Sequence, residues 1–376
     1  MPDALHLSKG LDDVVIGRSS IAFVGGETGE LVYRGFDAPT LARGVPYESV
    51  VHLLLFGDPP SADPSPEVTA ALRSSADLPP TAARVVDALP PGLPPLDALR
   101  TLLSALGDGS HGYPPTREEG LALVARTPIL LARYVRRSQG LAPVAPDASL
   151  GHAANYLRML RGAAPEPARV AALEGYLDLL ADHGMNASTF NLRIAISTHS
   201  DLMSAATGAL GTLKGPLHGG APSRVAEMLD AIGTPERAEP WIADRLARKE
   251  VLYGFGHRVY KTDDPRGLAL HAIARSIADP ERLALAETVE RAALAALRAA
   301  KPGARLFTNV EFYSAVVLEA VGLPPELFTP TFVVARTAGW AAHALEQAGD
   351  NRLIRPEVEY VGPARGRTWP RALPGA

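Results

Sequence analysis

Residues 281–300 read ERLALAETVERAALAALRAA, and this stretch shows most directly how the chain folds. Its apolar residues Ala286, Val289, Ala293 and Leu297 recur at steps of three and four, which places them on one face of a helix. The same period, bounded by glycine or proline, predicts further helices over residues 47–56, 101–106, 120–137, 150–160, 168–181, 223–232 and 329–347. In the last of these, Thr329 reads as an N-cap.

A strand signal occurs only near the start of the chain, where residues 21–24 and 30–34 flank Gly25 and Gly26. No strand–helix–strand alternation follows it. The predicted fold class is therefore mainly α, with a small N-terminal β-hairpin. We assign the prolines of residues 59–95 to connecting segments.

The composition excludes several classes of protein. The chain has 376 residues, of which 47% are hydrophobic and 21% charged, as in a globular protein large enough for two domains. It has no cysteine, which rules out disulfides and a cysteine nucleophile. A net charge of −4 argues against nucleic acid or an anionic membrane as a partner. Without a signal peptide or a long apolar run, we expect a cytoplasmic protein.

Three of the ten histidines lie in glycine-containing polar segments. His183 lies in ADHGMNAST (181–189), His218 in KGPLHGGA (214–221) and His257 in YGFGHRVYK (253–261). Glycine lets backbone amides approach a ligand closely, and the helix start predicted after His218 favours a neutral imidazole that can bind an oxyanion. On the residues alone, a structural role for each histidine is as consistent as a functional one.

Charged residues complete the candidate site. Arg336 interrupts an apolar run, so it should face a carboxylate of the protein or of a ligand. Glu311 stands between Val310 and Phe312, where burial would raise its pKa and suit it to act as a general base, although it would serve equally as a helix cap. A basic run also points to an anionic small molecule, and it consists of Arg245, Arg248, Lys249, Arg258, Lys261 and Arg266. Proton transfer next to a carbonyl group fits this set best.

These segments, in this order, resemble the citrate synthase family in its short bacterial and archaeal form, which includes 2-methylcitrate synthase. The resemblance rests on VHLLLFG (51–57), ADHGMNAST (181–189), KGPLHGG (214–220), GFGHRVYKTDDPR (254–266), NVEFYS (309–314), ARTAGW (335–340) and NRLIRP (351–356). It implies a helical homodimer. The large domain would comprise residues 1–212 and 323–376, and the small domain, residues 213–322, would close over the substrates.

The resemblance also implies a reaction and residue roles. Acetyl-CoA would condense with oxaloacetate, and the citryl thioester would be hydrolysed to citrate and CoA without a cofactor or a metal. The catalytic residues would be His218 for the enol, His257 for the ketone and Glu311 as the base. Oxaloacetate would be held by His183, His257, Arg266 and Arg336, with Arg355 reaching the neighbouring subunit's site. The CoA phosphates would meet Arg258, Lys261, Lys301 and Arg305.

One residue departs from the family pattern, which has aspartate where this chain has Glu311. The extra methylene would move the carboxylate by roughly 1 Å, enough to cost about a hundredfold in rate if nothing compensates. Two related functions stay open: 2-methylcitrate synthesis from propionyl-CoA, and non-catalytic binding of CoA or a dicarboxylate. A metallohydrolase using Asp182, His183, His199 and His218 lacks the helical spacing of metal ligands.

Overall fold

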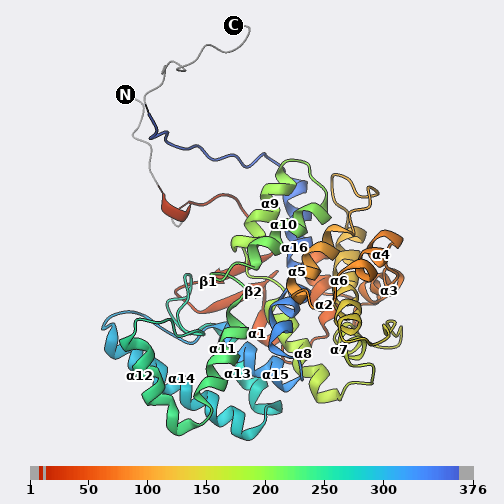
Figure 1. Cartoon of the computed structure of the whole chain (residues 1–376). Helices are drawn as coiled ribbons and strands as arrows, with labels where there is room; N and C mark the ends of the chain where they lie inside the picture. The colour runs from red at the N-terminus through yellow and green to blue at the C-terminus, as the bar shows by residue number, and fades with distance from the viewer. Residues whose placement is uncertain (1–7, 12–13, 364–376) are drawn as a thin grey trace, which may run out of the picture.

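The computed structural model describes residues 8–11 and 14–363, and most of them are helical (Figure 1). Residues 1–7, part of the segment searched for a signal peptide, lie outside this range. The helices are α1 (Ala38–Leu41), α2 (Tyr47–Phe56), α3 (Pro66–Ser74), α4 (Pro80–Ala88), α5 (Pro95–Ser104), α6 (Arg117–Ser138), α7 (His152–Arg161), α8 (Pro167–Leu180), α9 (Ala187–Ser197), α10 (Leu202–Leu213), α11 (Ala221–Ile232), α12 (Ala238–Ala247), α13 (Pro265–Ile277), α14 (Pro280–Ala300), α15 (Val310–Ala320) and α16 (Phe328–Gly349).

The predicted hairpin is present as strands β1 (Ala22–Gly25) and β2 (Glu30–Tyr33), which pair antiparallel with Ala22 opposite Tyr33. A third strand that the sequence did not predict, β3 (Phe36–Asp37), pairs with β2. It is two residues long, too short for an alternating pattern to be visible in the sequence. The predicted mainly α fold class with a small N-terminal hairpin is thus confirmed.

Helix α16 lies at the centre of the molecule. It is buried from Phe328 to Ala344 and packs against α2, α6, α8 and α9. Figure 1 shows α11–α14 gathered on one side of this helix and α2–α7 on the other. Helix α15 packs against α11 and α13 of the first group and against α8, which itself packs against α2 and α7 of the second. The ends of α8, α15 and α16 therefore bring distant parts of the chain close together.

The helix predicted over residues 281–300 is α14, and its predicted apolar face is buried. Ala286, Val289 and Ala293 are fully buried, and Leu297 is 9% exposed. Helix α14 packs chiefly on α12. The three- and four-residue spacing thus predicted both the helix and the face that it buries.

The prediction that residues 59–95 only connect other elements is wrong. Pro66, Pro80 and Pro95 each open a helix, at the starts of α3, α4 and α5. Proline suits the first helical position because its fixed φ is already helical and its missing N–H has no partner there anyway. For the same reason α5 starts at Pro95, before the predicted residue 101.

The predicted N-cap at Thr329 is also wrong, since α16 begins at Phe328 and has no side-chain cap. The hydroxyl of Thr329 instead donates to the carbonyl O of Gly219, at 3.0 Å. This hydrogen bond ties the central helix to the loop that carries His218.

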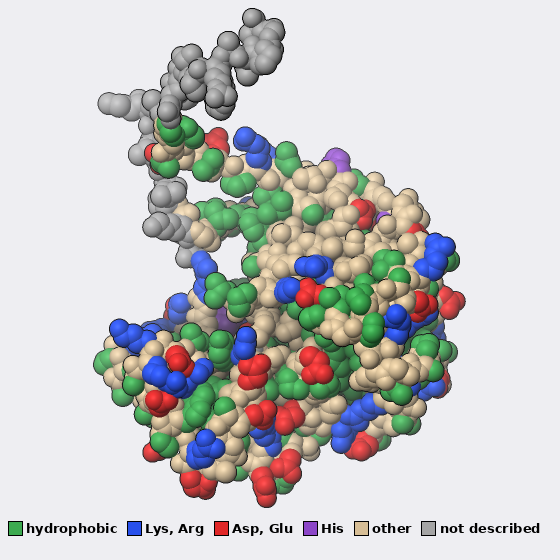
Figure 2. All heavy atoms as spheres, viewed as in Figure 1, with side chains coloured by type: hydrophobic (Ala, Val, Ile, Leu, Met, Phe, Trp, Pro, Cys, Tyr) green, Lys and Arg blue, Asp and Glu red, His purple; other side chains and the backbone are tan. Residues whose placement is uncertain are grey.

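On the surface, basic and acidic side chains are mixed over the face drawn in Figure 2, as the near balance of charge in the sequence suggests. Among the helices that the structure describes, none has the length and apolarity needed to cross a membrane.

Candidate active site

His183 stands in the corner between α8 and α9, and the backbone before it is tightly held. Tyr33 donates its hydroxyl to the carbonyl O of Asp182 at 2.9 Å, and Gly339 N–H donates to that of Ala181 at 3.1 Å. The His183 side chain is buried, with Nε2 3.2 Å from the hydroxyl of Tyr260. The corner therefore presents one imidazole in a fixed position.

The His257 loop is shaped by glycines on both sides of the histidine. Gly254 and Gly256 adopt φ values of +90° and +84°, and a Cβ at Gly254 would meet the ring of Phe312 at 2.7 Å. Nδ1 of His257 accepts from the backbone N–H groups of Val259 and Tyr260, each at 3.0 Å. Because Nδ1 is an acceptor, the hydrogen of the neutral ring lies on Nε2, which is left to donate to a ligand.

Arg266 is buried beside this loop and paired with Asp264. Its Nε and Nη2 donate to the two carboxylate oxygens of Asp264 at 3.0 and 2.8 Å. Asp264 also caps the start of α13. The Nη2 atom of Arg266 lies 3.5 Å from Nε2 of His257. The carboxylate thus holds the guanidinium next to the donor atom of His257.

His218 lies in the turn between α10 and α11, with Nε2 3.0 Å from the hydroxyl oxygen of Ser188. Its ring meets the edge of Phe332, with centroids 6.4 Å apart. Arg336 lies over the same phenylalanine, 4.8 Å from the ring centroid. Phe332 therefore contacts both an imidazole and a guanidinium of the site.

Arg336 is 1% exposed, as expected for a residue inside an apolar helix. Its Nε donates to the carbonyl O of Leu180 at 2.8 Å, and its Nη2 has no hydrogen-bond partner among the described residues. The charge of Asp182 acts on it from the protein side. Among the described residues, Asp182 thus acts on Arg336 through its charge without an ion pair, and one donor of the guanidinium is available for a ligand.

Glu311 occupies the first turn of α15. The helix cap is Asn309, whose side chain accepts from Glu311 N–H at 3.2 Å, so the capping role considered for Glu311 belongs to its neighbour. Burial raises the pKa of Glu311 to about 7, against the opposing charge of Arg266. Within the described part of the chain, its Oε2 atom has no hydrogen-bond partner. This is a carboxyl group that changes charge near neutral pH and has one oxygen without a donor from those residues.

The pKa values of all three histidines are lowered. Burial, with the charge of Arg336, lowers the pKa of His218 to about 4. Burial, with the charge of Arg266, lowers the pKa of His257 to about 4 and holds that of His183 well below its ordinary value. All three rings are therefore neutral near pH 7 and can each donate one hydrogen without carrying a charge.

The structure thus gathers six of the predicted residues into one cluster: His183, His218, His257, Arg266, Glu311 and Arg336. Arg355 is not part of it. The preceding residue, Ile354, donates its N–H to Ser197 at 3.1 Å, and the exposed segment beyond leads away from the body (Figure 1).

The four residues assigned to CoA phosphates are all exposed: Arg258, Lys261, Lys301 and Arg305. Two of them flank the β1–β2 turn, where Arg305 pairs with Glu27 at 3.1 Å and Lys261 N–H donates to Gly26 O at 2.8 Å. The basic run itself divides, since Arg245 and Arg248 pair with Glu250 while Arg266 reaches the cluster.

Several residues of the site were not predicted from the sequence. Asp264 and Asn309 each cap the helix that carries a functional side chain, and an Asp-Pro or Asn-Val pair before an apolar run is the signal that would have revealed them. Ser188 and Tyr260 contact histidines that are 30 and 77 residues away in the sequence. No local sequence pattern predicts such long-range contacts.

The metal-ligand set considered above is not assembled. The ring of His199 stacks on Tyr113 with centroids 4.0 Å apart, and Asp182 faces His343. In the part of the chain that the structure describes, no three His, Cys, Asp or Glu residues are grouped so as to hold a metal ion.

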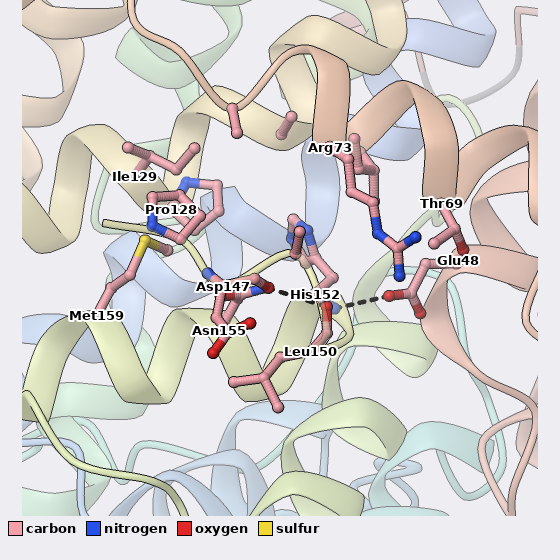
Figure 3. Close-up of a pocket in the computed structure, with 15 residues that line it drawn as sticks. Glu48, Thr69, Arg73, Pro128, Ile129, Asp147, Leu150, His152, Asn155 and Met159 are labelled. Atoms are coloured by element: carbon pink, nitrogen blue, oxygen red, sulfur yellow. Dashed lines mark hydrogen bonds between the residues drawn. The ribbon is translucent and has the colours of Figure 1, made fainter. Parts of the chain in front are cut away.

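A cavity of about 250 Å³ lies elsewhere, between α3, α6 and α7 (Figure 3). Glu48, Arg73 and His152 line it, and Glu48 accepts from the N–H of His152 at 2.6 Å. It includes none of the six clustered residues. The cavity is therefore separate from the cluster, with titratable side chains of its own in Glu48, Asp147 and His152.

Fold and cluster together define a helical enzyme that combines neutral imidazole donors, a titratable carboxylate and buried arginines for an anionic substrate. The family model described as citrate synthase, C-terminal domain, matches residues 10–357. The chain belongs to the citrate synthase family. The recognition, the fold and the enzyme class predicted from the sequence are thereby confirmed.

Known relatives span almost the whole chain. The citrate synthase of Haloferax volcanii is 38% identical over 371 residues, covering 95% of this chain and 96% of that protein. The 2-methylcitrate synthase 2 of Corynebacterium glutamicum is 39% identical over 367 residues, covering 94% of each. The citrate synthase of Thermoplasma acidophilum, solved as a ternary complex with carboxymethyl coenzyme A and oxaloacetate, has a TM-score of 0.90 at 28% identity and covers 97% of this chain and 98% of that one.

Proposed function

We propose that this enzyme condenses acetyl-CoA with oxaloacetate and hydrolyses the resulting citryl thioester to citrate and CoA. The observation that carries the proposal is a pair of buried atoms without protein partners, Oε2 of Glu311 and Nη2 of Arg336, in one cluster with three neutral histidines. A buried polar atom left without a partner is costly, so this place suits bound substrates that approach these two groups.

The first step is removal of a proton from the methyl group of acetyl-CoA. Ionised Glu311 takes this proton, and its raised pKa makes it a stronger base than an exposed glutamate. The oxygen of the thioester carbonyl gains charge as the proton leaves. A neutral His218 donates a hydrogen bond to that oxygen, so the enol forms without a full negative charge.

Oxaloacetate is held by the residues opposite. Arg266 and Arg336 pair with its carboxylates, and His183 contributes a hydrogen bond. The Nε2–H of His257 donates to the ketone oxygen, which makes the ketone carbon more electrophilic. The enol carbon attacks this carbon, and water then hydrolyses the thioester.

The remaining assignments concern the assembly. Residues 213–322 act as the small domain that closes on the rest of the chain and keeps water out until the carbon–carbon bond has formed. Two copies form a dimer in which Arg355 of each reaches the other's site. Arg258, Lys261, Lys301 and Arg305 contact the phosphates of CoA at the rim. The acid–base groups of the chain supply this chemistry without a cofactor other than the substrates.

A thiol-release assay tests the proposal, with oxaloacetate and either acetyl-CoA or propionyl-CoA. Rapid release with acetyl-CoA, lost in Glu311→Gln, is the expected result. If the folded protein releases thiol with neither thioester, the proposed reaction is wrong and the alternative function is non-catalytic binding of CoA or a dicarboxylate.

A second function rests on the relative from Corynebacterium glutamicum, which is named as a 2-methylcitrate synthase. The two substrates differ by one methylene group, which a pocket discriminates by only about 1–3 kcal/mol. A higher kcat/KM with propionyl-CoA than with acetyl-CoA would assign the chain to this second reaction.

A further inference from the structure

One face of α16 contacts three successive residues at the end of α8. Arg336 donates to the carbonyl O of Leu180, and Gly339 N–H donates to that of Ala181. One more turn along the helix, Nε2 of His343 lies 3.1 Å from Oδ1 of Asp182. Positions 336, 339 and 343 share a helix face because they are three and four residues apart. The next residue in the chain is His183.

The close approach of the two segments is built into the sequence. A Cβ at Gly339 would lie 2.4 Å from the carbonyl O of Ala181 and 2.5 Å from Oδ1 of Asp182. Only glycine allows α16 to lie this near the corner. His343 and Asp182 are both fully buried.

Arg193 on α9 fixes the hydrogen of His343. Its Nε and Nη2 lie 3.0 and 2.6 Å from Nδ1 of His343, and it also pairs with Glu346. A guanidinium can only donate, so Nδ1 is an acceptor and the ring hydrogen lies on Nε2. Nε2 of His343 and Oδ1 of Asp182 lie 3.1 Å apart, but neither atom has a well-aligned hydrogen bond among the described residues. The imidazole therefore places its N–H side against the carboxylate and restrains it by this close contact.

The carboxylate of Asp182 has a competing attraction. Its charge acts on Arg336, whose Nη2 has no protein partner. Two contacts hold Asp182 in place: Gly184 N–H donates to Oδ2 at 2.7 Å, and His343 faces Oδ1. Without the second contact, the carboxylate is free to rotate toward the unpaired guanidinium donor and occupy it.

We propose that His343 is a positioning residue for the dicarboxylate substrate. Held by Arg193, it restrains the Asp182 carboxylate, keeps Nη2 of Arg336 available to a substrate carboxylate and fixes the corner that presents His183. His343 touches no substrate itself. The inference rests on the proposed function, since it assigns Arg336 and His183 to oxaloacetate.

The test compares His343→Leu, which keeps the volume roughly but loses both hydrogen-bonding atoms, with His343→Gln. The glutamine amide offers an oxygen for Arg193 and an N–H group for Asp182. We expect KM for oxaloacetate to rise roughly tenfold or more in His343→Leu, the size of a weakened hydrogen bond to a charged group, with a much smaller change in kcat. His343→Gln should restore most of this loss.

Two further variants separate positioning from general loss of stability. Adding Asp182→Asn to His343→Leu removes the competing charge and should lower KM again. Tyr156→Phe removes a buried hydrogen bond from α7 to Thr331 of α16, 2.9 Å long, away from the corner. It should lower the melting temperature without moving KM. If His343→Leu lowers only the melting temperature, or if glutamine rescues nothing, the inference is wrong.

Calorimetric titration with oxaloacetate alone makes the outcome independent of turnover. A wild-type protein that binds oxaloacetate but releases no thiol refutes the proposed reaction and still tests His343, through the affinity of its variants. A wild-type protein that does not bind oxaloacetate refutes both.

Discussion

The hydroxyl oxygen of Ser188 lies 3.0 Å from Nε2 of His218, so Nδ1 is the ring nitrogen that does not face Ser188. In the proposed reaction Nδ1 carries the hydrogen donated to the acyl oxygen, so Nε2 has to accept from Ser188. The same hydroxyl donates to Oδ1 of Asn186 at 2.8 Å and accepts from Nε1 of Trp340 at 3.3 Å, so its position is well determined. Because the hydroxyl has a single hydrogen, the proposed enolisation step requires it to turn from Asn186 to Nε2 of His218, where Ser188 then fixes the tautomer that carries its hydrogen on Nδ1.

The substitution Ser188→Ala should lower kcat by about tenfold to a hundredfold, because His218 keeps its place but loses the partner that fixes its tautomer. KM for oxaloacetate should change little, since Ser188 lies on the acyl side of the site. Steady-state kinetics measure both. The matched control is Ser314→Ala, which removes a buried hydroxyl that donates to the carbonyl O of Val310 at 2.7 Å. Equal losses in the two variants would contradict the role of Ser188.

The pH dependence of turnover should follow Glu311, because the base acts only when it is ionised. Its pKa of about 7 places the rise of kcat near neutral pH: activity is low below this value, increases through it and then levels off. A kcat profile between pH 5.5 and about 9 gives the apparent pKa. A flat profile through pH 7 would show that another group, or another step, limits the rate.

Replacement of Glu311 tests the identity of the base directly. Glu311→Gln keeps the shape but cannot take a proton, and it should cost about 10²–10⁴ in kcat. Glu311→Asp withdraws the carboxylate by roughly 1 Å and should cost about a hundredfold unless the site adjusts. Thiol release under saturating substrates measures both. Wild-type turnover in Glu311→Gln is the result that removes Glu311 from the mechanism.

Asp178 should lower the stability of the protein at neutral pH. It is 1% exposed, neither of its oxygens has a hydrogen-bond partner among residues 8–11 and 14–363, and burial beside Glu174 and Glu48 raises its pKa well above the ordinary value. The folded state therefore keeps a proton that the unfolded chain loses above about pH 4, so the free energy of unfolding falls as pH rises above this point.

Asp178→Asn removes this titration and should raise the free energy of unfolding by about 1–3 kcal/mol at pH 7. The gain should shrink toward pH 4, where the wild-type carboxyl is protonated in both states. Urea denaturation at several pH values measures it, with the exposed Asp58→Asn as the control. A gain that does not depend on pH would assign the effect to packing rather than to charge.

The sequence predicted those parts of the fold that depend on local patterns. The buried face of α14 and the bounds of α2 (Tyr47–Phe56) agree with the spacing of apolar residues and the glycine that follows. The helices that begin at prolines within residues 59–95 were not predicted. Proline both opens helices and interrupts them, and only the residues around it decide which. β3 is too short to show an alternating pattern, and the true start of α16 goes with a tertiary contact, that of Thr329 with Gly219.

In the candidate site, too, the sequence predicted only the residues that local patterns reveal. Glycine loops and a buried arginine are visible in one sequence, so His218, His257 and Arg336 could be singled out before the fold was known. Their partners could not, since Ser188, Asp182 and His343 come from other segments and show no special spacing. The tautomer of His257 is fixed within its own loop by the N–H groups of Val259 and Tyr260, whereas that of His218 depends on Ser188 from α9. Local sequence therefore indicates which groups react, and the packing of α9 and α16 decides how they are held.

The final prediction concerns Arg355, which lies outside the cluster formed by its own chain. Ile354 is anchored to Ser197, and the exposed segment beyond it leads away from the body (Figure 1). If Arg355 completes the site of a second copy, then Arg355→Ala and Glu311→Gln, each poorly active alone, should complement each other when co-refolded. A mixed dimer then contains one site with both native residues and one with neither. Equal amounts of the two variants make half of the dimers mixed, so about a quarter of the wild-type activity should return.

Sedimentation confirms the dimer, and each variant refolded alone is the control. If Arg355 acts within its own chain, every site of the mixture lacks one residue and no activity returns.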